Sequence, residues 1–108
     1  MIDKPETNNY NVCTQYQWDE EKDRSNQEKH GVSFEEAASV FEDEYALLLL
    51  DWAHSDHEER FIIIGQSVAL RVLFVCHCYR EQGNTIRIIS ARKATNLERR
   101  FYEKGLPK

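Results

Sequence analysis

The pattern of apolar and polar residues changes near residue 45. Before this point the chain is mostly polar and carries helix signals rather than strand signals. Asp19 can cap a helix over residues 20–29, which Gly31 ends. Ser33 and Glu36 have the spacing of a capping box for a second helix that extends through Phe41.

After residue 45 the pattern is typical of strands joined by short turns. Apolar runs occupy residues 46–50, 60–64, 70–79 and 85–92, and the third is the longest. A final helix is predicted over residues 96–104, with Thr95 as its cap. Short connections favour antiparallel pairing of neighbouring strands.

These elements predict an α+β fold of two N-terminal helices, a four-stranded antiparallel meander and a C-terminal helix. A short strand at residues 14–18 is left open as an addition to the sheet. Residues 1–13 lack periodicity, so we expect a flexible extension followed by one domain over residues 14–108. No apolar run is long enough to span a membrane, and no secretion signal is recognisable, which favours the cytoplasm.

Charge is strongly segregated along the chain. The net charge is -5, but residues 61–108 carry +6 and residues 1–60 carry -11. This asymmetry predicts one surface that faces a polyanion and another that is acidic. It says nothing about the fold.

The segment at residues 87–95 joins the last strand to the last helix. Arg87, Arg92 and Lys93 provide three positive charges there, next to the free N–H groups of a helix start. The alternative is a solvated strand edge beside a well-capped helix. Strict strand alternation would put Arg87 and Arg92 on opposite faces, so both can act together only if the strand bulges or ends before Arg92.

Two further segments contain residue types that carry chemistry. Cys76-His77-Cys78 is disfavoured as a metal site because alternation turns His77 away from the two cysteines. The loop at residues 51–60 combines histidines and carboxylates with an arginine, which suits proton transfer, although a solvated charged loop is the simpler alternative. Glycine fingerprints for nucleotides are missing, and we expect no cofactor and no metal.

Several ordered motifs resemble the BrnT toxin family. They include Trp18-Asp19-Glu20-Glu21-Lys22, the run from Lys29 to Ala37, Glu58-Glu59-Arg60, Ile64-Gly65, the run from Arg87 to Ala94, and Glu98, Arg99 and Tyr102. The resemblance covers about residues 16–105. It implies a RelE-like fold and the ribonuclease toxin of a type II toxin–antitoxin pair, which inhibits translation.

The resemblance also implies partners and a mechanism. The partners are RNA and a BrnA-like antitoxin, which forms an oligomer with the toxin and contacts DNA for both. Such toxins are expected to cleave RNA without a metal, through attack by the 2'-hydroxyl. The candidates for phosphate stabilisation are Arg60, Arg87 and Arg92, those for proton transfer are His30, His54 and Glu59, and those for RNA binding are Lys22, Lys29, Lys93 and Arg99.

Two other functions remain open at this stage. One is a catalytically inactive module that sequesters an antitoxin or acts in operon autoregulation. The other is RNA binding without cleavage, which requires aromatic side chains beside basic residues on one sheet face. Only Phe74 and Tyr79 offer such positions in the predicted sheet.

Overall fold

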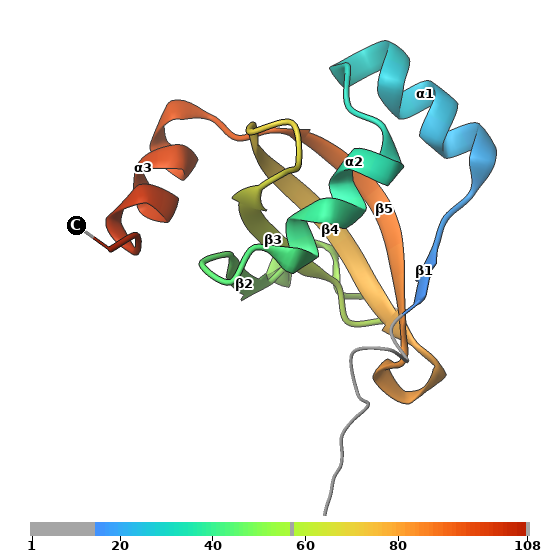
Figure 1. Ribbon diagram of the computed structural model, residues 1–108. Helices are drawn as coiled ribbons and strands as arrows, with labels where there is room; N and C mark the ends of the chain where they lie inside the picture. The colour runs from blue at the N-terminus through green and yellow to red at the C-terminus, as the bar shows by residue number, and fades with distance from the viewer. Residues whose placement is uncertain (1–14, 57, 108) are drawn as a thin grey trace, which may run out of the picture.

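A five-stranded mixed sheet organises the computed structural model, which describes residues 15–56 and 58–107 (Figure 1). The strand order is β1-β5-β4-β3-β2. The strands are β1 Gln15–Gln17, β2 Leu47–Leu50, β3 Phe61–Gln66, β4 Val72–Arg80 and β5 Thr85–Lys93. The helices are α1 Glu20–His30, α2 Phe34–Ser39 and α3 Asn96–Lys104, with 3₁₀ turns at Val40–Glu42, Trp52–His54 and Glu81–Gly83.

The α+β class and the antiparallel order β2-β3-β4-β5 agree with the sequence prediction, but a purely antiparallel four-stranded sheet is wrong. Strand β1 pairs with β5 in parallel, so the sheet has five strands and is mixed. Most of the chain lies between β1 and β5, so no local turn signal predicts their pairing. The expected extension at residues 1–13 lies outside the described residues.

Helix α1 is almost entirely polar, and its ends and one buried residue account for its position. The Asp19 side chain accepts hydrogen bonds from the backbone N–H groups of Glu21 and Lys22, and Gly31 ends the helix with a φ of 68°. Asn26 is buried and exchanges hydrogen bonds with the backbone of Ala91 in β5, at 2.8 and 3.1 Å. This amide therefore fixes α1 beside β5 in place of an apolar stripe.

Helices α1 and α2 lie over one face of the sheet, which we call the helix face (Figure 1). Its core packs Phe34 and Val40 against Leu73, Val75 and Ile88, all with at most 2% of their surface exposed. Full burial of a side chain such as Phe34 contributes about 2–3 kcal/mol. This apolar layer holds the sheet rigid beneath the other face.

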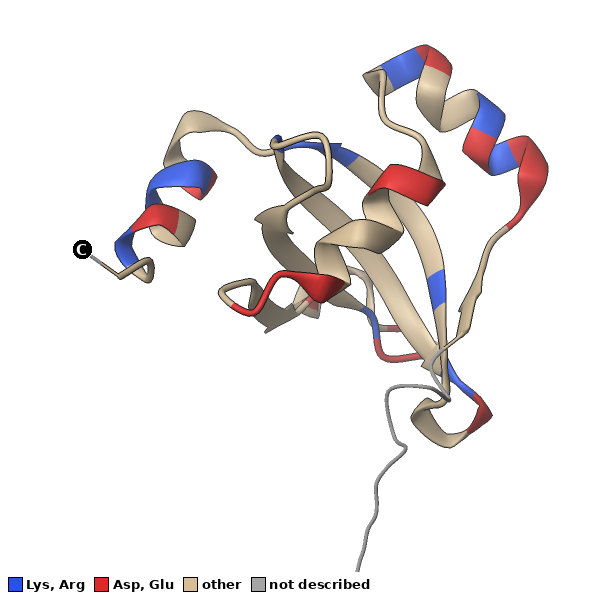
Figure 2. Cartoon of the chain, viewed as in Figure 1, with Lys and Arg blue, Asp and Glu red and all other residues tan. Residues whose placement is uncertain are grey.

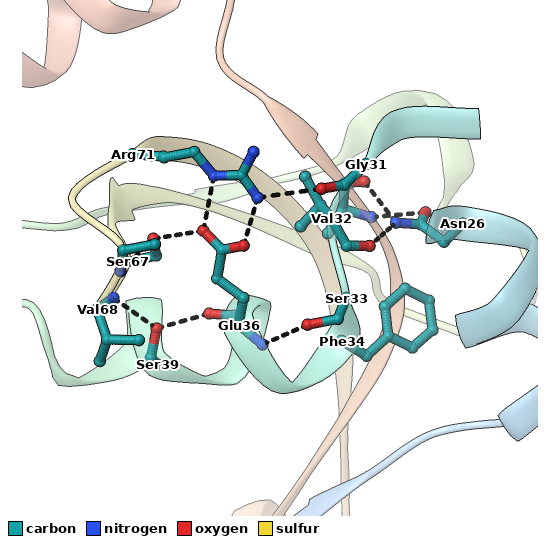
Figure 3. Close-up of polar contacts among 12 residues, drawn as sticks. Asn26, Gly31, Val32, Ser33, Phe34, Glu36, Ser39, Ser67, Val68 and Arg71 are labelled. Atoms are coloured by element: carbon teal, nitrogen blue, oxygen red, sulfur yellow. Dashed lines mark hydrogen bonds and ion pairs between the residues drawn. The ribbon is translucent and has the colours of Figure 1, made fainter. Parts of the chain in front are cut away.

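Polar contacts tie α2 to the turn between β3 and β4 (Figure 3). Ser33 caps α2 by accepting from the N–H of Glu36, but the Glu36 carboxylate does not return to Ser33 as the predicted capping box requires. It instead pairs with Arg71 and accepts from the Ser67 hydroxyl at 2.6 Å. The predicted cap at Ser33 is therefore confirmed, but the reciprocal hydrogen bond from Glu36 is wrong, because this carboxylate makes a tertiary contact instead.

The strand predicted over residues 60–64 continues past Gly65 in the structure, because β3 extends to Gln66. The reason for a glycine here is a close approach. A Cβ added at Gly65 would lie 2.8 Å from the Cβ of Ala46. Glycine thus lets the segment that precedes β2 pack closely against β3.

Helix α3 covers one end of the face opposite α1 and α2, which we call the opposite face. Tyr102 is buried there with Ile64 and Val72, and its hydroxyl donates to the Asp43 carboxylate at 2.6 Å. The other end of the opposite face carries the loop between β2 and β3. None of the helices in the described part of the chain is long and apolar enough to cross a membrane.

Candidate active site

A β-bulge between β4 and β5 settles how Arg87 and Arg92 lie. Cys76 pairs with Ser90, while the next residue of β4, His77, pairs with Ile88, so Ile89 is the extra residue. Arg87 then pairs with Cys78, and Arg92 pairs with Phe74, four residues earlier in β4. Positions 74 and 78 of one strand share a face, so both arginines lie on the opposite face, about 13 Å apart.

The two arginines have different partners. Arg92 forms a bidentate ion pair with Glu98, at 2.9 and 3.0 Å, and lies 3.9 Å above the ring of Phe74. The hydrogen bond from Arg92 lowers the pKa of Glu98, so this carboxylate stays charged. Arg87 donates one hydrogen bond to the side-chain oxygen of Gln17, at 3.0 Å. Its guanidinium therefore keeps donors for a phosphate, whereas that of Arg92 is largely occupied.

The loop at residues 51–60 is closed by hydrogen bonds across its base. The N–H of Asp51 donates to the carbonyl of Arg60 at 2.8 Å. The Ser55 hydroxyl donates to the carbonyl of Asp51 at 2.6 Å and accepts from the N–H of Arg60 at 3.0 Å. Inside this closed loop, His54 Nδ1 lies 3.1 Å from an oxygen of the Asp51 carboxylate.

These loop residues meet β4 and β5 at what we call the sheet-end cluster: His54, Glu58, Arg60, Arg80 and Arg87. A hollow of about 210 Å³ is lined by His54, Asp56, Glu58 and Arg60. Glu58 accepts a hydrogen bond from Arg80 at 2.6 Å. Arg87 pairs with Cys78 in β4, so it lies at the same end and on the same face of the sheet as Arg80, with its guanidinium turned to Gln17 of β1.

The charges at this cluster are mixed, because Asp56 and Glu58 line the hollow beside Arg60. The hydrogen bond from Arg80 lowers the pKa of Glu58, and the charge of Arg60 acts in the same direction. Glu58 is thus an ionised partner of Arg80 at neutral pH, not a good proton acceptor. Arg60 lines the hollow together with the histidine of the loop, and its charge also acts on Glu58.

The cysteines beneath the cluster are poor nucleophiles. Burial raises the pKa of Cys76 to about 11, and the negative charge of Asp51 adds to the effect. His77 lies on the helix face instead, where its ring packs against Phe41 and Phe61. Among residues 15–56 and 58–107, no group of three or more His, Cys, Asp or Glu side chains has the geometry of a metal site.

A second hollow, of about 270 Å³, lies between α1 and β5. Lys22, Lys29 and His30 line it from α1, and Ile89 and Ser90 line it from the bulge. Helical spacing explains the first group, because residues 22, 26, 29 and 30 share one side of a helix. Figure 2 shows acidic residues mixed with these lysines along α1, so the hollow is basic only on the side that faces β5.

The structure thus divides the predicted site residues into three groups. His54 and Arg60 line one hollow, with Arg87 at the same end of the sheet, and Lys22, Lys29 and His30 line the α1 hollow. The others are apart: Arg92 pairs with Glu98, while Glu59, Lys93 and Arg99 are exposed, with Lys93 acting on Glu36 of the helix face. None of these roles is tested by geometry alone, so they stay predictions.

Sequence reasoning missed three residues of this region: Asp51, Glu58 and Arg80. Asp51 and Glu58 were in the loop that the sequence singled out, but spacing could not tell which carboxylate pairs with which base. Arg80 shares strand parity with Cys76 and Cys78, and this signal could have placed it on the same face.

Comparison with known proteins places this chain in a ribonuclease family. Residues 18–98 match the family of ribonuclease toxins named BrnT, of type II toxin–antitoxin systems. The crystal structure of the Brucella abortus ribonuclease toxin BrnT is similar in fold, with a TM-score of 0.60 and 24% identity over 77% of this chain and 99% of that one. A comparison with curated protein sequences gave no match. Since the family match spans most of the chain, this protein belongs to the BrnT family of ribonuclease toxins.

Proposed function

We propose that this protein is an endoribonuclease toxin that cleaves RNA at the sheet-end cluster without a metal ion. The observation that carries the proposal is that His54 and Arg60 line one open hollow, at the end of the sheet where Arg87 lies on the same face. An imidazole provides proton transfer near neutral pH, and guanidinium groups fit phosphate oxygens. These are the requirements of RNA cleavage by an internal nucleophile.

In this mechanism the 2'-oxygen attacks the adjacent phosphorus while His54 accepts the 2'-hydroxyl proton. The bond between phosphorus and the 5'-oxygen breaks, and that oxygen takes a proton from a second group. The products are a 2',3'-cyclic phosphate and a 5'-hydroxyl. Each proton transfer contributes about 10²–10⁴ in rate, and Glu59 and His30 stay candidates for the second one.

Arg60 and Arg87 stabilise the additional negative charge on the phosphate in the transition state. Arg80 holds Glu58 and keeps this carboxylate from pairing with Arg60. We leave Arg92 outside the reacting group because Glu98 already occupies its guanidinium. Lys93 and Arg99 are assigned to peripheral RNA contacts.

The α1 hollow supplies a path for the RNA backbone away from the cleavage point. Ser90 lines this hollow and also lies on the opposite face. Arg87 is its neighbour on that face, because the two residues pair with Cys76 and Cys78 of β4. A strand bound at Arg87 can therefore extend over Ser90 toward Lys22 and Lys29. Phosphate contacts of this kind position a nucleic acid without reading its sequence.

The family membership extends the proposal to the protein's biological context. A BrnA-like antitoxin binds the toxin in an oligomer, blocks cleavage and provides the contact with operator DNA. The fold is RelE-like and the outcome of RNA cleavage is inhibited translation. Free Cys76 and Cys78 fit action in the reducing cytoplasm.

A cleavage assay with matched variants tests the proposal. Purified protein free of antitoxin is incubated with a structured RNA in EDTA, beside His54→Ala, Arg60→Gln and, as control, Arg24→Gln on the exposed surface of α1. Wild type and Arg24→Gln should cleave, and each site variant should lose about 10²-fold in rate. The new 5' fragments should end in a 2',3'-cyclic phosphate, and a 2'-deoxy substitution at the cleaved position should block the reaction.

The same assay decides against the proposal in two ways. Cleavage that needs a divalent ion, or that survives the 2'-deoxy substitution, contradicts the mechanism. A folded wild type that binds RNA or antitoxin but cuts nothing supports the alternative of an inactive module that sequesters an antitoxin.

A further inference from the structure

We propose that Asp51 is a positioning residue, which holds the His54 imidazole so that Nε2 is the nitrogen that exchanges protons with RNA. The inference rests on the proposed function, because it assigns the group that prepares His54 for that reaction. It goes further in naming a residue that does not touch the substrate and in fixing which ring nitrogen is used.

The two side chains differ sharply in exposure. The Asp51 side chain is 11% exposed and that of His54 is 66% exposed. Both carboxylate oxygens of Asp51 lie near His54 Nδ1, at 3.3 and 3.1 Å. A buried carboxylate thus supports an accessible imidazole, which lines the hollow beside Arg60.

The Asp51 carboxylate is itself held in place. The Cys76 thiol lies 3.9 Å from its Oδ2, and burial keeps this thiol protonated by raising its pKa to about 11. The backbone of Asp51 is clamped to Arg60 and Ser55 by the hydrogen bonds that close the loop. Fixed support of this kind is what a catalytic group needs to keep a productive geometry.

The contact has a chemical consequence for His54. An ionised carboxylate only accepts hydrogen bonds, so the nitrogen that faces it must carry the proton. In the neutral ring, Nδ1 then bears hydrogen and Nε2 bears the lone pair. His54 is therefore prepared to accept the 2'-hydroxyl proton through Nε2, as a carboxylate prepares the histidine in other hydrolytic sites.

A purely structural role for Asp51 predicts different behaviour. In that case its carboxylate would only stabilise the short 3₁₀ turn at Trp52–His54, and its loss would resemble the loss of any other loop contact. Ser55 offers a matched comparison, because its hydroxyl bridges the same loop without contacting the imidazole.

The test combines NMR of the histidine rings with single-turnover cleavage, on full-length wild type, Asp51→Asn and Ser55→Ala. In wild type, long-range ¹H–¹⁵N spectra of the neutral His54 ring should show hydrogen on Nδ1 and none on Nε2. Asp51→Asn should abolish this preference and slow cleavage by about 10²-fold, with RNA affinity unchanged within twofold. Ser55→Ala should keep the tautomer, because its hydroxyl bonds the loop backbone and not the imidazole, while lowering the melting temperature.

A double-variant comparison completes the test. In a His54→Ala background, Asp51→Asn should cause no further loss of rate, since its effect passes through the imidazole. An equal loss in both backgrounds, or an Nε2-protonated His54 in wild type, overturns the inference. Absence of cleavage by wild type overturns the proposed function and the catalytic part of this inference together, whereas a wild-type enzyme that cleaves while Asp51→Asn is unaffected overturns this inference alone.

Discussion

The opposite face of the sheet has two ends that use the same residue types differently. At the end covered by α3, Arg92 is paired with Glu98, stacked on Phe74 and close to the buried Tyr102. At the other end, Arg87 donates to the neutral side chain of Gln17, and Arg60 borders an open hollow with His54. Arg87 and Arg92 both lie in β5, so the strand alone does not explain why the two ends differ.

The difference shows that the partner of an arginine, rather than its position in a motif, decides its role. Arg87 and Arg92 belong to one motif and share one face because of the bulge at Ile89. Helix α3 brings a carboxylate to Arg92, whereas Arg87 contacts the neutral amide oxygen of Gln17. A cation already satisfied by a carboxylate has little free energy to gain from a phosphate.

The largest expected effect follows directly from this comparison. Arg87→Gln should lower the single-turnover rate of RNA cleavage by about 10²–10³-fold, because it removes a charge that stabilises the transition state. Arg92→Gln should leave the rate per folded molecule within about tenfold. Thermal denaturation should show the reverse order, with the larger loss of stability for Arg92→Gln.

Equal loss of cleavage in both variants, with both folded, would break the comparison. It would restore Arg92 to the reacting group and require its ion pair with Glu98 to open when RNA binds. Arg100→Gln, on the exposed surface of α3, controls for a simple loss of positive charge.

Most of the fold follows from local signals in the sequence. Asp19 with Gly31, and Thr95 with Glu98, end or begin helices where predicted, because a cap depends on neighbours in the chain. The parallel pairing of β1 with β5 and the contact of Glu36 with Arg71 depend on residues 35 or more positions apart. No local pattern encodes such pairings.

The candidate site was predictable as a set of residue types but not as an arrangement. Alternation left it open whether Arg87 and Arg92 share a face, and only the register with β4 shows that Ile89 is the extra residue. Likewise, the loop contains several carboxylates, and the choice of Asp51 for His54 and of Glu58 for Arg80 depends on how the loop closes.

A substitution at Asp43 should destabilise the α3 end of the opposite face without altering the sheet-end cluster. The Asp43 carboxylate accepts hydrogen bonds from the N–H groups of Gln66 and Tyr45 and from the Tyr102 hydroxyl. Partial burial alone would raise the pKa of Asp43, but these hydrogen bonds outweigh it and hold the pKa below its usual range. Asp43→Ala should lower the free energy of unfolding by about 3 kcal/mol in urea denaturation, because three donors lose a charged acceptor.

The exposed neighbour Glu44 provides the control, and Glu44→Ala should change stability by less than about 0.5 kcal/mol. Cleavage per folded molecule should be the same in both variants. A loss of cleavage in Asp43→Ala that exceeds the loss of folded protein would mean that the two ends of the face are coupled.

The helix face adds a pH dependence through a buried histidine. His77 is fully buried, and burial lowers its pKa to about 4, compared with 6.5 in the unfolded chain. The unfolded state therefore binds an additional proton below pH 6.5, and stability falls as pH decreases from 6.5 to about 4. Between pH 7 and pH 5 the loss should be about 2 kcal/mol.

His77→Phe removes this titration while keeping an aromatic ring beside Phe41 and Phe61. Its free energy of unfolding should change by less than about 0.5 kcal/mol between pH 7 and pH 5, whereas wild type should show the full decrease. A wild-type protein whose stability is constant over that interval would contradict a neutral, buried His77.

The smallest expected effect comes from releasing Arg92 without removing it. Glu98 accepts from both Arg92 and the N–H of Thr95, so Glu98→Gln should lower the free energy of unfolding by about 1 kcal/mol. The unpaired guanidinium then becomes available to phosphate, about 13 Å along the sheet from Arg87. RNA affinity measured at low salt should rise by about two- to fivefold, while the cleavage rate stays unchanged, because a freed cation at this distance adds binding and not transition-state stabilisation. A cleavage rate that rises with affinity would instead mean that the ion pair restrains catalysis, and the two ends of the face would then form one site.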